Sequence, residues 1–300
     1  MTDTIPALDT ALGFSLPDRN ARGRLVRLGP ALTAILAAHG YPDAIERVLA
    51  EALGLTALFG ATLKDAAGQL TLQAQTKGGA IDLLVCDYRG GEMRGYVRHD
   101  PERLAALPAN PSLAALFGEG YLAITFDQAV SGERYQGIVP LEGASLAEAA
   151  ERYFAQSEQI PSLLRIGIAR DAAGAMVVGG LLLQYLPEGE EGRDRLHTRL
   201  DHPEWEHVAA LGGSVLDEEL TDPALPLETV LWRLFNEDKV LVFPSLGIRK
   251  GCRCDPDHVA AVIARFPDED RARMVEDDGM VRVDCEFCAR QFAIPLAPAA

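Results

Sequence analysis

Four cysteines near the C-terminal end of this 300-residue chain form two closely spaced pairs. Cys252 and Cys254 flank a single arginine, Cys285 and Cys288 are separated by two residues, and thirty residues lie between the pairs. The whole chain has five cysteines, so this clustering is far from a random scatter. Two nearby thiolates can bind one side of a metal ion, and a second pair completes a tetrahedron. The spacing therefore predicts one zinc ion bound by these four residues.

A zinc ion with four thiolate ligands has no open coordination position, so it would support a fold and would not activate water. The sequence between the pairs fits a small fold of this kind. Asp255 and Pro256 have the form of a helix N-cap and first helical residue. The apolar residues that follow them at helical spacing are Val259, Val262, Ile263 and Phe266. Asp278-Gly279 then predicts a hairpin turn before a strand that leads into the second pair.

Two interpretations of this metal site follow from the residues alone. One is a structural zinc ribbon that binds its ion permanently. The other is a redox switch, because closely spaced thiolates react with oxidants, each pair can close into a local disulfide, and disulfides do not bind zinc as thiolates do. Structural zinc contributes about 10–16 kcal/mol to small metal-dependent domains, whereas a core of some fifty residues supplies at most about 3–5 kcal/mol. Loss of the metal should therefore unfold the C-terminal segment.

Length, composition and charge limit the class of protein. Three hundred residues suffice for a main domain and a smaller one. The formal charge of −16 argues against nucleic-acid binding and against attraction to anionic membranes. Residues 1–18 lack a signal-peptide pattern, and no apolar run reaches the roughly 18 residues that span a bilayer. Clustered cysteines fit a reducing compartment, so we expect a cytoplasmic protein.

The pattern of residues 1–190 predicts a domain of hairpins and grouped helices. Strands are expected over residues 21–29, 70–75, 79–88, 92–98, 121–128, 134–139, 163–170 and 175–185. Helices are expected over residues 30–39, after Tyr41-Pro42, and after Ser145, whose Ser-x-x-Glu pattern has the capping-box form. One stripe of the second helix is apolar and should face the core: Ile45, Val48, Leu49, Ala52 and Leu55. The expected fold class is α+β, with packed helices and a mainly antiparallel sheet.

An acidic helical linker is expected over residues 191–245, followed by a small zinc-binding domain over residues 246–300. Between Pro187 and Asp222 there are eleven Asp or Glu and three Arg, a net charge of −8. Apolar residues at helical spacing are Trp205, Val208, Ala209 and Val215, then Leu227, Val230, Leu231, Leu234 and Phe235. Like charges destabilise isolated helices, so such helices should stay folded only where something covers their apolar faces. The alternative is a solvated connector without a regulatory role.

Other residues with reactive side chains give no catalytic pattern. Cys86 lies in an apolar run and is interpreted as a buried core thiol. His197, His202 and His207 are five residues apart, so they do not share one helix face and are interpreted as surface residues. The glycine pairs do not have phosphate-loop or dinucleotide-binding spacing, and no nucleophile elbow is present. The sequence therefore predicts a protein that is not an enzyme.

Several stretches resemble the redox-regulated chaperones of the heat shock protein 33 family. They are residues 41–64, residues 83–98 (LLVCDYRGGEMRGYVR), residues 133–139, residues 145–162 (SLAEAAERYFAQSEQIPS) and the two cysteine pairs. The cysteine spacing is the most specific of these features, because the family pattern also has about thirty residues between the pairs. The resemblance therefore covers most of the chain.

This resemblance implies a function for the predicted site. In the reduced state, one zinc ion would be bound by Cys252, Cys254, Cys285 and Cys288. Oxidation would form the disulfides Cys252–Cys254 and Cys285–Cys288, release zinc, and unfold the C-terminal domain and the linker. The protein would then bind unfolding clients without ATP, often as a homodimer. It would act as a holdase, a chaperone that prevents aggregation.

Two other functions are weighed against this one. A thiol–disulfide oxidoreductase could use Cys285 and Cys288, but such pairs normally lie at a helix N-terminus, and here the pair follows a predicted strand. A binding module with a constitutive zinc ribbon, for ribosomes or nucleic acid, would need a basic face. The many acidic residues between Asp255 and Asp284 argue against that face.

Overall fold

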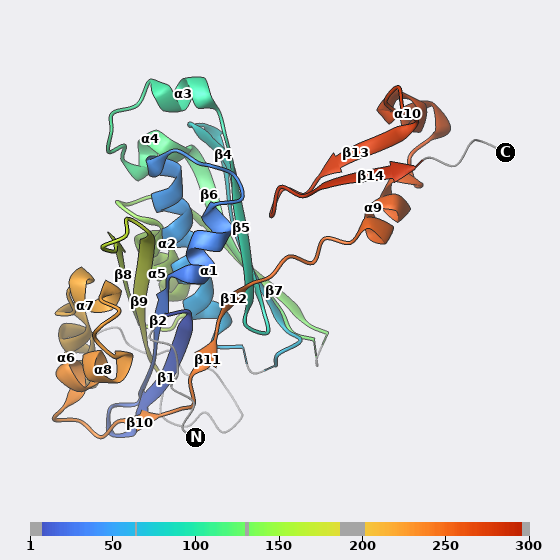
Figure 1. The fold of residues 1–300 in the computed structure, drawn as a ribbon. Helices are drawn as coiled ribbons and strands as arrows, with labels where there is room; N and C mark the ends of the chain where they lie inside the picture. Colours follow the sequence, from blue (N-terminus) through green and yellow to red (C-terminus); the bar gives the residue numbers. More distant parts are fainter. Residues whose placement is uncertain (1–7, 64, 130–131, 187–201, 296–300) are drawn as a thin grey trace.

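Two mainly antiparallel sheets form the body of the computed structural model, which describes residues 8–63, 65–129, 132–186 and 202–295 (Figure 1). In sheet A the strand order is β10-β1-β2-β9-β8, and β11 also pairs with β1. In sheet B the order is β12-β5-β4-β3-β6-β7, where β12 runs parallel to β5. The strands of sheet A are β1 (Thr10–Leu16), β2 (Ala21–Leu28), β8 (Ser162–Arg170), β9 (Met176–Tyr185), β10 (Leu241–Val242) and β11 (Leu246–Gly247). The strands of sheet B are β3 (Gln69–Gly78), β4 (Ile81–Arg89), β5 (Glu92–His99), β6 (Gly118–Asp127), β7 (Arg134–Pro140) and β12 (Arg249–Lys250).

Helices cover and separate these sheets, and a small hairpin of β13 (Met280–Asp284) and β14 (Gln291–Pro295) follows near the C-terminus. The short helical turns are η1 (Pro17–Arg19) and the π-helix η2 (Phe154–Glu158). The α-helices are α1 (Pro30–Leu36), α2 (Asp43–Gly60), α3 (Pro101–Ala105), α4 (Leu113–Phe117), α5 (Leu146–Tyr153), α6 (Pro203–Gly213), α7 (Asp217–Thr221), α8 (Leu227–Phe235), α9 (Pro256–Ile263) and α10 (Asp268–Met274). The predicted α+β class, with mainly antiparallel sheets, is confirmed.

Helix α2 lies between the two sheets and forms the centre of the largest hydrophobic core. Its first turn carries Asp43 and Glu46, whose charges suit the positive end of the helix dipole. The apolar stripe expected from the sequence is buried, as predicted. The helix also buries its other faces, because a sheet packs on each side of it. At Gly60 a Cβ atom would lie 2.2 Å from the ring of Tyr88, so only glycine allows this contact between helix and sheet.

A carboxylate lies within this largely apolar layer. Glu51 of α2 accepts a hydrogen bond from the backbone N–H of Ala147 at 2.9 Å, at the start of α5. Burial raises the pKa of Glu51 from 4.5 to about 7, and backbone hydrogen bonds from Ala147 and Leu146 offset only part of that rise. The folded state therefore binds a proton more tightly than the unfolded chain does. This contribution to stability is complete below pH 4.5 and is lost as the pH rises through 7.

We expect the substitution Glu51→Gln to flatten this pH dependence. Glutamine keeps an accepting oxygen for Ala147 and carries no charge, so the variant should gain stability relative to the wild type above pH 7, by up to about 3 kcal/mol. Urea unfolding of both proteins between pH 5 and pH 8, followed by circular dichroism, measures the difference. Because other titrating groups cancel in that difference, parallel pH curves for the two proteins would contradict the prediction.

Helices α6, α7 and α8 pack on the outer face of sheet A, beside β8 and β9 (Figure 1). Their apolar residues join those of the sheet in a second core, which confirms the predicted stripes. The residues of this segment buried there are Trp205, Val208, Leu220, Leu227, Val230, Leu231, Leu234 and Phe235 from the helices and Val215 from the connection between α6 and α7. The sheet supplies Leu12, Phe14, Leu16, Ala21, Leu25, Leu181, Leu183 and Tyr185. Residues 187–201 of the acidic stretch lie outside the described part of the chain.

The C-terminal unit has a separate small core. Four of its described side chains are buried: Ile263, Val281, Phe292 and Ile294. As predicted, Asp255 caps α9 by accepting a hydrogen bond from the N–H of Asp257 at 3.0 Å, and Asp278-Gly279 forms a turn that leads into β13. The domain boundaries after residues 190 and 245 stay predictions. Strands β11 and β12 lie beyond the second boundary and pair with sheets A and B.

Within the described residues, no helix has both the length and the apolar character that crossing a bilayer requires.

Candidate metal centre

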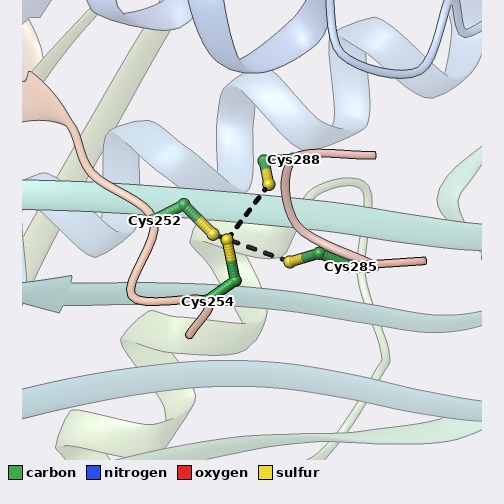
Figure 2. A group of neighbouring side chains, drawn as sticks. All are labelled: Cys252, Cys254, Cys285 and Cys288. Atoms are coloured by element: carbon green, nitrogen blue, oxygen red, sulfur yellow. Dashed lines mark hydrogen bonds between the residues drawn. The ribbon is translucent and has the colours of Figure 1, made fainter. Parts of the chain in front are cut away.

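The four cysteine side chains converge on one point (Figure 2). Cys252 and Cys254 lie on the segment that leaves β12, and Cys285 and Cys288 lie in the turn between β13 and β14. Their Sγ atoms all lie within 4.8 Å of one another. The Sγ–Sγ distances are 3.6 Å for Cys252 and Cys285 and 3.5 Å for Cys254 and Cys288. A tetrahedral zinc ion with Zn–S bonds of about 2.3 Å places its sulfurs about 3.8 Å apart. The residues present therefore fit the predicted ion.

The backbone around the second pair forms a tight turn that directs both sulfurs inward. Cys285 accepts a hydrogen bond from the N–H of Ala289 at 2.8 Å through its carbonyl, and its own N–H donates to Arg290 at 2.9 Å. Ala289 has a φ of 55°, a left-handed conformation that lets the chain reverse direction within a few residues. The cysteine pair therefore closes the β13–β14 hairpin, and a fixed turn geometry sets the separation of its sulfurs.

The thiols of this cluster favour binding a cation. Burial raises the pKa of Cys252, but hydrogen bonds from the backbone and thiol of Cys254 and from the other thiols outweigh it and bring that pKa to about 7. Burial and contacts with Cys252 and Cys288 raise the pKa of Cys254 to about 12. Burial also raises the pKa of Cys285. One thiolate therefore forms easily, and further negative charge beside it needs a positive ion to balance it.

The turn with the second cysteine pair rests on the outer face of sheet B. The guanidinium carbon of Arg94 on β5 lies 3.8 Å from the ring centroid of Phe287, which comes between Cys285 and Cys288. The ring of Tyr96 meets the same phenyl ring edge-on, with centroids 4.9 Å apart. Arg253, between the first two cysteines, reaches Asp87 of β4 at 3.4 Å. This contact was not predicted from the sequence, where its only local signal is the alternation of Arg94 and Tyr96 with a glycine on a strand.

The other residues singled out from the sequence lie apart from this cluster. Cys86 is completely buried in the main core, and burial raises the pKa of its thiol, so the prediction of an inert core cysteine is confirmed. His202 is exposed at the N-cap of α6, as expected of a surface residue. His207 is only partly exposed and pairs with Asp238 at 3.3 Å, so its description as a plain surface residue was incomplete. His197 lies outside the described residues.

Comparisons with known proteins agree with this architecture. The family model described as "Hsp33 protein" matches residues 9–295. The 33 kDa chaperonin of Caulobacter vibrioides is 38% identical over 98% of both chains. That of Shigella boydii is 36% identical over 90% of this chain and 87% of its own. Among solved structures, the 33 kDa chaperonin (heat shock protein 33 homolog) of Thermotoga maritima matches with a TM-score of 0.77. The aligned region covers 96% of this chain and 95% of the Thermotoga chain, with 23% sequence identity, so this comparison shows a shared fold.

Proposed function

Because the chain belongs to the Hsp33 protein family, as its sequence predicted, we propose that it is an ATP-independent holdase chaperone activated by oxidation. The observation that carries the proposal is the cluster of four thiols, which joins the segment after β12 to the β13–β14 turn in a unit whose described residues bury four apolar side chains. Such a unit has too little core to fold alone. Its fold therefore depends on the state of its sulfurs.

The resting state in this proposal is reduced, with one zinc ion bound by Cys252, Cys254, Cys285 and Cys288. When bound, the ion fixes the four sulfurs in one tetrahedron and so supplies folding free energy. Two equivalents of peroxide would then convert the four thiolates to the disulfides Cys252–Cys254 and Cys285–Cys288. The thiolates supply four electrons and the solvent supplies four protons, so that the two peroxides leave as four molecules of water. Disulfide sulfurs no longer bind zinc, and the unit of residues 246–300 unfolds.

Unfolding of this unit would next destabilise the linker, residues 191–245. The linker helices carry acidic surfaces and depend on sheet A for burial of their apolar faces. The part of sheet A beneath them is apolar, with Leu12, Phe14 and Leu181 among its side chains. Departure of α6, α7 and α8 would expose this surface on residues 1–190 to unfolded clients. Hydrophobic burial is the main favourable term in such binding.

The proposal also includes the compartment, the oligomeric state and the partners expected from the sequence. The protein would act in the cytoplasm, where the reduced state is the resting one, and would dimerise when oxidised. Its partners would be unfolded or oxidatively damaged proteins. A net charge of −16 disfavours nucleic acid and anionic membrane surfaces as partners.

Activity after oxidation tests the proposal directly. We expect the reduced, zinc-bound protein not to suppress aggregation of a heat-unfolded client, and peroxide with mild heat to activate suppression while about one zinc ion per chain is released. Light scattering and a zinc-sensitive dye measure the two events. Cys86→Ala is the matched control, because that buried thiol lies outside the cluster and its loss should leave activation unchanged. Equal activity in both states, with zinc retained, would contradict the switch and favour a constitutive ribbon.

Thiol–disulfide oxidoreductase activity is disfavoured by the position of the second pair. Cys285 and Cys288 lie in a hairpin turn between two strands, whereas reactive Cys-x-x-Cys pairs use a helix N-terminus to lower the pKa of one thiol. Catalytic reduction of insulin by this protein would support that alternative.

A further inference from the structure

Phe287 is held in a site made by two side chains of β5. Its ring lies against the Arg94 guanidinium at 3.8 Å and against the edge of Tyr96 at 4.9 Å, with the two rings at 85° to each other. Phe287 itself is partly exposed, and Glu286 beside it is exposed. The phenyl ring therefore contacts a cation and a second aromatic ring while part of its surface stays accessible to solvent.

The two side chains that form this site belong to sheet B. Asp87, which is only 4% exposed, accepts hydrogen bonds from Arg94 at 2.7 and 2.9 Å and from the hydroxyl of Thr71 at 2.7 Å. Asp87 also pairs with Arg253 of the C-terminal unit at 3.4 Å, but Arg94 and Thr71 are partners from sheet B itself. Tyr96 lies opposite Val85 in the register of β4 and β5. When residues 251–295 leave, we expect Arg94 to stay paired with Asp87 and Tyr96 to stay on β5.

We propose that this Arg94–Tyr96 site binds aromatic side chains of unfolded clients, and that Phe287 occupies it in the resting state as an internal stand-in. The inference rests on the proposed function, because the C-terminal unit must leave before a client can enter. Its basis is the occupant seen in the structure, the phenyl ring of Phe287 against Arg94 and Tyr96. Oxidation then uncovers two surfaces: an apolar one on sheet A, and this cationic–aromatic one on sheet B.

Affinity of the oxidised full-length chain for an unfolded protein tests the inference. The probe is fluorescently labelled α-lactalbumin, reduced and carboxymethylated so that it cannot refold. We expect Tyr96→Ala to weaken binding by about fivefold, since it removes the ring edge from the site, and Tyr96→Phe to bind like the wild type. Ile138→Ala is the matched control: Ile138 lies in the same row across sheet B, on β7, with three strands between it and β5, and is 55% exposed. Equal effects of Tyr96→Ala and Ile138→Ala would overturn the inference.

A photocrosslinker gives an independent readout that loss of stability would not imitate. With p-benzoyl-phenylalanine in place of Tyr96, we expect crosslinks to residues 285–288 in the reduced protein and to carboxymethylated α-lactalbumin after oxidation. The same crosslinker in place of exposed Lys77, at the far end of β3, should capture much less of the probe. Equal capture at the two positions would overturn the inference and leave the proposed function intact. Failure of the oxidised wild type to bind the probe at all would instead contradict the proposed function.

Discussion

Replacing Cys285 and Cys288 with serine is expected to leave residues 251–295 unfolded under reducing conditions, while both large sheets keep their structure. The four enclosed apolar residues of this unit can supply at most about 3–5 kcal/mol, and ordering a chain costs about 1–2 kcal/mol per residue. A bound zinc ion contributes about 10–16 kcal/mol in comparable units. Without two of its four ligands that contribution is lost. Hydrogen exchange of the β13–β14 hairpin, together with the zinc content, measures the effect.

Two controls accompany this prediction, the Cys86→Ala variant and the amides of the large sheets. Cys86→Ala removes a thiol from the main core without touching the cluster, so it should leave hairpin protection and zinc content unchanged. The amides of β3, β4 and β6 should stay protected in the serine variant, because their core is centred on α2 and includes none of residues 251–295. A serine variant that lacks zinc and yet protects the hairpin amides as the wild type does would show that the metal is not what folds this unit.

The metal site could be predicted from the sequence because its chemistry is local. Two cysteines separated by one or two residues already form half of a tetrahedral site. The tertiary fold is needed only to bring two such pairs together. The stripe of α2 and the capping residue Asp255 were found for the same reason, since both depend on residues within a turn or two. Strand β1 was missed. Its sequence, TALGFSL, has no alternation of apolar and polar residues, because nearly the whole strand is buried. Its residues contribute to the core around α2 on one face of sheet A and to the core under α6, α7 and α8 on the other.

Contacts between distant segments could not be predicted in the same way. The acidic helices were expected to need another surface to bury their apolar faces, but nothing in their sequence indicates that this surface is the outer face of sheet A. The contact of Phe287 with Arg94 and Tyr96 joins residues almost two hundred positions apart. An exposed strand residue and an exposed turn residue look alike in sequence whether or not they meet. Such pairings depend on strand order, which propensity and periodicity do not encode.

The second large effect is expected at Arg27, a fully buried arginine on β2 that attaches the linker helices to sheet A. Its guanidinium donates to three backbone carbonyls: those of Leu220 at 2.7 Å and Glu219 at 2.8 Å in the last turn of α7, and that of Leu225 at 2.6 Å in the connection to α8. Carbonyls at a helix C-terminus have no partner within the helix. In Arg27→Met all three lose their donor, and an unpaired buried polar group costs about 1–3 kcal/mol. The loss should total at least about 3 kcal/mol, enough to release α7 and loosen α6 and α8.

Under the proposed function, Arg27→Met should therefore bind unfolded protein under reducing conditions with zinc still bound. Hydrogen exchange should rise in α6, α7 and α8 while the β13–β14 hairpin stays protected, which separates release of the linker from loss of the metal. Arg24→Met is the matched control on the same strand. Arg24 donates to the carbonyls of Ala61 and Gly23 and contacts no linker helix by hydrogen bond, so its loss should weaken the sheet without exposing the linker. If Arg27→Met leaves exchange in α7 unchanged, the three carbonyl bonds do not hold the linker in place, and the attachment must come from the apolar core beneath it.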